Sequence, residues 1–138
     1  MGGHMKLSTR YGVVGLAALA LLSIGHWVRG LSGEWEPALA FFLGVLPNVA
    51  AAIAIPFIFM GVLADQKKDA PLSVIRNWFF GSVIVSFVSL LGWELIQQKS
   101  DRLVFDLNDI GATIVGSAIA IAVFAAVTKR ARARSVYK

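Results

Sequence analysis

Four long apolar runs, separated by short polar segments, constrain this chain more than any other feature of its 138 residues. The runs cover residues 11–28, 38–64, 74–96 and 107–128. Each is about as long as a helix that crosses the hydrocarbon core of a bilayer. Backbone amides in hydrocarbon must be satisfied within their own segment, and no run alternates apolar and polar residues as a transmembrane β-strand does. We therefore predict an all-α integral membrane protein with four spanning helices.

The composition excludes several other classes of protein. Apolar residues make up 57% of the chain and charged residues only 15%, whereas about a quarter of a soluble domain is charged. The absence of cysteine excludes disulfides, thiolate catalysis and zinc–thiolate sites. We assign residues 1–5 to a tag remnant and start, because Met1-Gly2-Gly3-His4 is typical of an expression tag. Residues 6–138 then form a single four-helix transmembrane domain.

Basic residues are distributed unevenly between the two sides of the predicted membrane domain. Ten of the 13 Lys and Arg residues flank the two termini and the loop after the second run. This bias predicts cytoplasmic termini and a bacterial plasma (inner) membrane location, and the short loops predict an up-down bundle. The basic tail 129–138 is explained by anionic lipid, and we expect no nucleic-acid partner because no recognition motif accompanies it.

Polar residues near the outer ends of the third and fourth runs form the candidate site. Glu94 lies about one turn from the end of the third run, and Gln97 follows on the same face. Asp106, Asp109 and Thr113 recur at intervals of three and four, which places them on one face of the fourth helix. Carboxylates at membrane depth are costly and usually face a bundle interior or a watery cavity. These residues are therefore candidates for ligand binding.

The sequence is compatible with three chemical roles for the carboxylates of this site. Glu94, Asp106 and Asp109 can bind a divalent cation, exchange protons, or accept hydrogen bonds from a headgroup or sugar, with Arg102 neutralising part of the charge. Asp106 is equally well explained as the N-cap of the fourth helix. We identify no catalytic residues, because no histidine or lysine accompanies the serines of the third run. The pattern does not favour an enzyme.

Two further features concern helix packing. Ala112, Gly116 and Ala120 form a ridge of small residues that lets another helix approach closely, within the chain or in a homo-oligomer. Pro47 and Pro56 interrupt the second run, and each removes a backbone hydrogen-bond donor. They indicate either a kinked packing helix or a lateral entrance for a lipid-like ligand.

Residues 94–116 resemble the VanZ-like family of small membrane proteins. The matching residues are Glu94 and Gln97 of the family's Glu-x-x-Gln pattern, Arg102 in the following loop, and Asp109 with Gly116 in the next helix. Thr113 stands where the family commonly has Asn. The resemblance implies a cell-envelope protein, and some members of the family are linked to resistance to the glycopeptide teicoplanin. It also implies an outward-facing site that meets lipid-tailed ligands.

These observations lead to one main functional hypothesis and two alternatives. The main hypothesis is a non-enzymatic envelope protein that recognises or excludes a lipid-tailed glycopeptide or a cell-wall lipid. The first alternative is a membrane immunity protein that neutralises a pore-forming toxin. The second is a small metal-dependent enzyme that modifies lipids. The expected partner is a membrane lipid or lipid-tailed ligand, and the only cofactor considered is a divalent cation.

Overall fold

The computed structural model describes residues 5–31, 35–98 and 107–136, and the side chains of residues 5–31, 35–96 and 107–129. The described chain forms four helices, which are α1 (Leu7–Gly30), α2 (Pro37–Gln66), α3 (Leu72–Gln98) and α4 (Leu107–Val136). All four are long and apolar enough to cross a membrane. The prediction of an all-α chain with four such helices is therefore confirmed.

The helices α2 and α4 begin where local chemistry favours a helix start. At the start of α2 the Glu36 carboxylate accepts a hydrogen bond from the Leu39 amide at 3.4 Å, and Pro37 occupies the first turn. A side-chain acceptor before the helix and a proline at its first position both suit the unpaired amides there. Asp109 lies in the first turn of α4, where a negative charge faces the positive end of the helix dipole.

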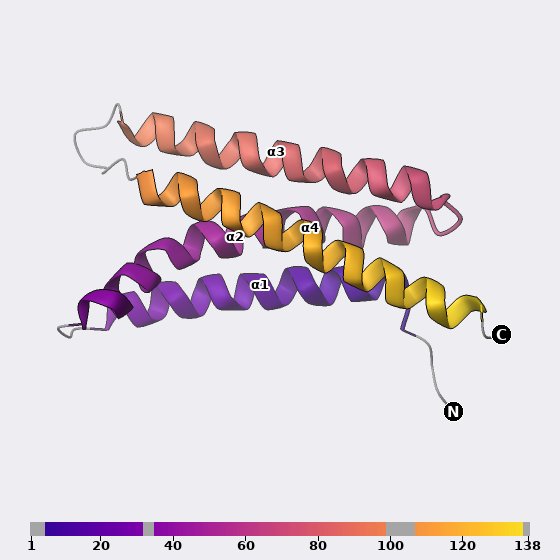
Figure 1. Ribbon diagram of the computed structural model, residues 1–138, viewed down its shortest axis with the longest axis horizontal. Helices are drawn as coiled ribbons and strands as arrows, with labels where there is room; N and C mark the ends of the chain where they lie inside the picture. The colour runs from indigo at the N-terminus through magenta and orange to yellow at the C-terminus, as the bar shows by residue number, and fades with distance from the viewer. Residues whose placement is uncertain (1–4, 32–34, 99–106, 137–138) are drawn as a thin grey trace.

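Consecutive helices run in opposite directions (Figure 1). The start of α1, the α2–α3 connection and the end of α4 lie at one end of the molecule, which we call the termini end. The opposite end, where α3 finishes and α4 begins, we call the Glu94 end. Within the described residues α2 contacts all three other helices, whereas α1 does not contact α3. The fourth helix also contacts the other three, but α2 makes the more extensive contacts with them.

Glycines bring α1 and α2 into very close contact. A Cβ atom added to Gly15 would lie 2.9 Å from Cγ1 of Ile58 and 3.0 Å from its backbone nitrogen. A Cβ added to Gly61 would lie 3.2 Å from Cα of Gly12 on the opposite helix. Small residues of this kind allow helix backbones to pack closely where no hydrophobic driving force acts between them. We call this contact the α1–α2 glycine seam.

The half of the bundle near the termini end is filled by aromatic side chains from all four helices. Phe79 of α3 and Phe124 of α4 are stacked with ring centroids 3.9 Å apart, and Tyr11 and Phe57 pack beside them. The Tyr11 hydroxyl shares a buried hydrogen bond of 3.0 Å with the Thr128 hydroxyl. This aromatic core closes the interior at the termini end.

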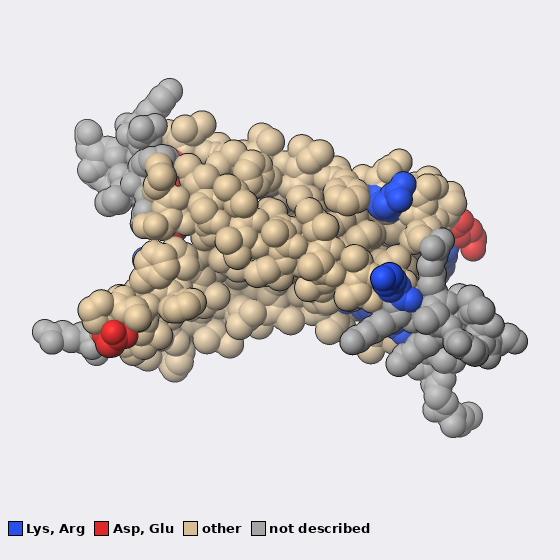
Figure 2. Space-filling model, viewed as in Figure 1, with Lys and Arg blue, Asp and Glu red and all other residues tan. Residues whose placement is uncertain are grey.

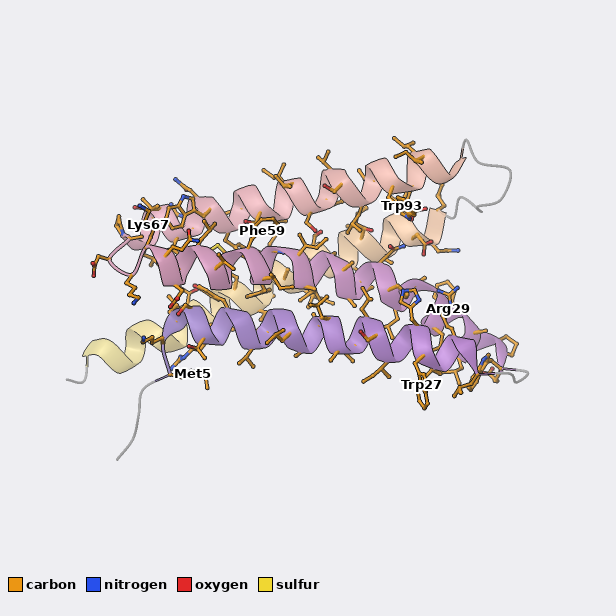
Figure 3. All side chains as sticks on the ribbon, turned by 180° about the vertical axis from the view of Figure 1, so that it is seen from behind. Met5, Trp27, Arg29, Phe59, Lys67 and Trp93 are labelled. Carbon is orange, nitrogen blue, oxygen red and sulfur yellow. The ribbon has the colours of Figure 1, made fainter. Side chains whose placement is uncertain are left out.

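Large apolar side chains cover much of the outer surface. Trp27 and Phe59 are 67% and 52% exposed, and Figure 3 shows Trp27 projecting away from α1. Trp27 and Trp93 lie towards one end of the bundle, and Lys67 lies at the other. Exposed apolar residues over the whole length of a helix suit contact with lipid tails, and tryptophans near helix ends suit the interface.

Candidate functional site

Glu94 lies inside the bundle at the end of α3. Its side chain is only 2% exposed. The reason is its register, because it continues the buried face of α3 that also carries Phe79, Ser82 and Ser86. A carboxylate buried in an otherwise apolar helix is costly and is usually retained for function. Its burial agrees with the expectation that a carboxylate at membrane depth faces the bundle interior, and Glu94 stays a candidate site residue.

Asp109 and Thr113 lie in the first two turns of α4, the part that begins beside the end of α3. The Thr113 hydroxyl donates a hydrogen bond of 2.9 Å to the backbone carbonyl of Asp109 one turn earlier. Thr113 is 1% exposed, and Asp109 is half-buried. Figure 1 shows the start of α4 beside the end of α3, so these residues and Glu94 share the Glu94 end.

The remaining predicted site residues lie wholly or partly outside the described residues. Arg102 and Asp106 lie outside the described residues, and so does the side chain of Gln97, whose backbone belongs to α3. The described part of the chain contains no group of three or more His, Cys, Asp or Glu residues able to hold a metal ion. Because Asp106 lies outside that part, the divalent cation stays a prediction.

Two buried serines extend the polar lining towards the middle of the bundle. Ser86 of α3 and Ser117 of α4 are 1% and 9% exposed, and neither hydroxyl makes a hydrogen bond to a described residue. Ser117 follows Thr113 by four residues and therefore lies on the same face of α4. Buried hydroxyls of this kind can bind polar groups that enter from the Glu94 end. Sequence reasoning missed Ser117, although its spacing from Thr113 was a usable signal.

An apolar groove lies between α2 and α4 at the same end. Its volume is about 520 Å³, and its lining includes Phe42, Leu46, Asn108 and Gly111. Within the helix, Pro47 removes a backbone donor, and Figure 1 shows that α2 changes direction along its length. Prolines are a common cause of such bends. The lining on α2 runs from residue 41 to 49, which places Pro47 beside the groove.

The ridge of small residues on α4 packs against α2 of the same chain. Ala112, Gly116 and Ala120 are buried, and a Cβ added to Gly116 would lie 2.7 Å from the Val49 carbonyl oxygen. The ridge thus serves helix packing within one chain. A homo-oligomer stays a prediction, and a second copy would have to use a different surface.

The fold and the site together describe a small helical protein with four helices able to cross a membrane, and with a buried carboxylate and an apolar groove at one end. The chain is similar to the "Tetracycline resistance protein, class D" of Salmonella ordonez, with 25% identity over 140 aligned positions. The alignment covers 90% of this chain and 35% of that protein, so the chain spans about a third of its length. No family model matches the chain, and no solved structure matches it.

Proposed function

We propose that this chain is a bacterial membrane protein of antibiotic resistance that binds an amphiphilic ligand at the Glu94 end. The ligand class we favour is a lipid-tailed glycopeptide or a cell-wall lipid. The observation that carries the proposal is the presence of a buried carboxylate and an apolar groove at the same end of the bundle. Glu94 places a carboxylate at the end where the polar part of the ligand would bind, and the groove of about 520 Å³ would hold its apolar part.

Each of these two features suits its half of the ligand for a physical reason. The groove volume falls within the range of about 300–1,000 Å³ typical of small-molecule sites. Phe42 and Leu46 supply its apolar wall, and Asn108 supplies an amide at its edge. Glu94 and Asp109 accept hydrogen bonds from the hydroxyl, amide or amine groups of a headgroup or sugar, and such charge-assisted bonds are strong.

The proposed orientation has the Glu94 end facing outward and both termini in the cytoplasm. By sequence, ten of the 13 Lys and Arg residues lie next to the two termini or to the connection between α2 and α3, and Lys and Arg are enriched in cytoplasmic loops. Figure 2 shows blue side chains gathered at the termini end of the face that it draws. An outward-facing site would meet an envelope ligand before it enters the cell.

A second candidate ligand is tetracycline. The observation that favours it is the similarity to the class D tetracycline resistance protein, which extends over 90% of this chain. The chain spans only 35% of that protein, so we rank this ligand below the lipid-tailed one.

Antibiotic susceptibility of a sensitive host tests the proposal. Cells would express the wild type, Glu94→Gln or Gly111→Leu and would be exposed to teicoplanin, to vancomycin, which lacks the lipid tail, and to tetracycline. Glu94→Gln removes the buried carboxyl group, whereas Gly111→Leu fills the groove at a position where an added Cβ meets nothing within 4 Å. Asp69→Asn is the matched control, because it removes an exposed carboxylate at the termini end.

The expected result is protection against teicoplanin that both site variants lose and that the control retains. Loss of a charge-assisted hydrogen bond weakens binding about tenfold or more, and protection should fall accordingly. Protection against tetracycline alone would support the second ligand. A wild type that reaches the membrane and protects against none of the three drugs would overturn the proposal.

A further inference from the structure

The termini end carries a second apolar groove, between α3 and α4, which the proposed function does not use. Its volume is about 540 Å³. Leu72 and Phe80 of α3 and Ile121 and Ala125 of α4 supply apolar lining. The stacked pair of Phe79 and Phe124 joins the two helices in this half of the bundle, and Phe124 is part of the lining.

Two basic side chains border this groove. Arg76 of α3 and Lys129 of α4 belong to its lining, and both are exposed. Figure 2 shows blue side chains over α3 and α4 at this end of the face that it draws. No other charged residue lines the groove in the part of the chain that the structure describes. The groove therefore combines a positive edge with an apolar interior.

The charged and apolar residues of the groove lie on the same face of each helix but at different positions along it. Phe80 follows Arg76 by four residues, and Ala125 precedes Lys129 by four, so on each helix the cation and the apolar residue share a face. The cations lie near the ends of the spans Leu72–Ile96 and Leu107–Lys129, at the depth of lipid headgroups. Phe80, Ile121 and Ala125 lie one or two turns deeper than the cation of their helix, at the depth of acyl chains, whereas Leu72 lies at the end of its span.

We propose that this groove binds one anionic phospholipid, with its phosphate on Arg76 and Lys129 and an acyl chain between α3 and α4. The arrangement matches such a lipid in charge and in depth, since a phosphate accepts charge-assisted hydrogen bonds from both side chains. A second copy of this chain fits less well. A two-fold symmetric contact places the same patch on both partners, which would bring the four cations together.

Native mass spectrometry of the full chain in a non-ionic detergent tests this site. The protein would be titrated with phosphatidylglycerol and, separately, with phosphatidylcholine of identical acyl chains. The double variant Arg76→Gln/Lys129→Gln removes the positive edge. Its matched control, Lys67→Gln/Lys68→Gln, removes the same charge from exposed residues at the same end that do not line the groove.

Each basic residue near an anionic headgroup accounts for about a fivefold change in binding. We expect wild-type protein and the Lys67/Lys68 control to bind phosphatidylglycerol more tightly than phosphatidylcholine. The Arg76/Lys129 variant should lose that preference. Ala125→Trp, which fills the groove and keeps both cations, should weaken the binding of both lipids.

Three results would overturn the proposal. The first is equal binding of the two lipids by wild type. The second is an equal loss in the Arg76/Lys129 variant and in its control, which would indicate attraction by net charge alone. The third is unchanged lipid binding by Ala125→Trp. Thermal unfolding of each variant in the same detergent would establish that the compared proteins are folded.

Discussion

Replacing Gly116 with alanine tests how closely α2 and α4 pack beside the candidate site. The added Cβ would lie 2.7 Å from the Val49 carbonyl oxygen, 2.9 Å from its Cα and 2.8 Å from Cβ of Ala52. Two of these three atoms belong to the α2 backbone, so rotation of a side chain cannot relieve the contact. An ordinary contact begins at 3.4 Å, and the two helices must therefore separate by about 0.7 Å.

The expected cost of Gly116→Ala is a loss of about 1–3 kcal/mol in the free energy of unfolding, typical of an overpacked site. Gly111→Ala on the same helix is the matched control, because an added Cβ there meets nothing within 4 Å. Alanine is a better helix former than glycine by up to about 1 kcal/mol, so Gly111→Ala should be neutral or stabilising.

The assay is unfolding of the purified protein in mixed micelles, with a rising fraction of dodecyl sulfate and helicity followed by circular dichroism. Both variants add one methyl group to α4, at two different positions. Because only the methyl group at position 116 meets α2, the difference between the two variants isolates the contact with α2. If Gly116→Ala and Gly111→Ala unfold within about 0.5 kcal/mol of each other, the close approach of α4 to α2 is refuted.

Two further predictions concern the aromatic core and use the same unfolding assay. The first uses Tyr11→Phe and Thr128→Val, alone and combined. Their coupling energy should be about 0.6 kcal/mol, as for other hydrogen bonds between membrane helices. A coupling energy of zero would contradict the hydrogen bond between the two hydroxyls. Phe79→Ala should lower the free energy of unfolding by about 2 kcal/mol, the cost of the cavity that it leaves, because its ring is fully buried against Phe124. Phe59→Ala, which removes an exposed ring of the same size, should change it by less than about 0.5 kcal/mol, and equal losses would contradict this description of the core.

The helices and the position of Glu94 could be predicted from the sequence because both depend on local pattern. Apolar runs of the length of a bilayer require helices. A carboxylate at membrane depth is costly, which predicts that Glu94 faces the bundle interior, where the structure has it buried. Likewise, the spacing of Ala112, Gly116 and Ala120 marked a packing face, although it did not identify α2 as the partner.

The long-range contacts could not be predicted in this way. Tyr11 and Thr128 are 117 residues apart in the chain, and nothing local to either residue indicates the other. The same holds for Gly15, whose neighbour Ile58 depends on how α1 and α2 are rotated about their axes. Both grooves also depend on the relative placement of two helices, which hydropathy does not determine. From the sequence, Pro47 indicated either a kinked packing helix or a lateral entrance for a ligand. Only its position beside the groove connects it to the candidate site.

The α1–α2 glycine seam has a consequence for the biogenesis of this protein. Its contacts lie within the first 66 residues of the chain, so the first hairpin carries its own packing surface when it leaves the insertion machinery. Membrane helices insert first and associate afterwards, and here the first association does not have to wait for the second half of the chain. Completion of the aromatic core has to wait, because Tyr11 meets Phe124 and Thr128 only after α4 has been synthesised. Ribosome-bound chains that end before α4 should therefore hold a formed hairpin with an unfinished interior.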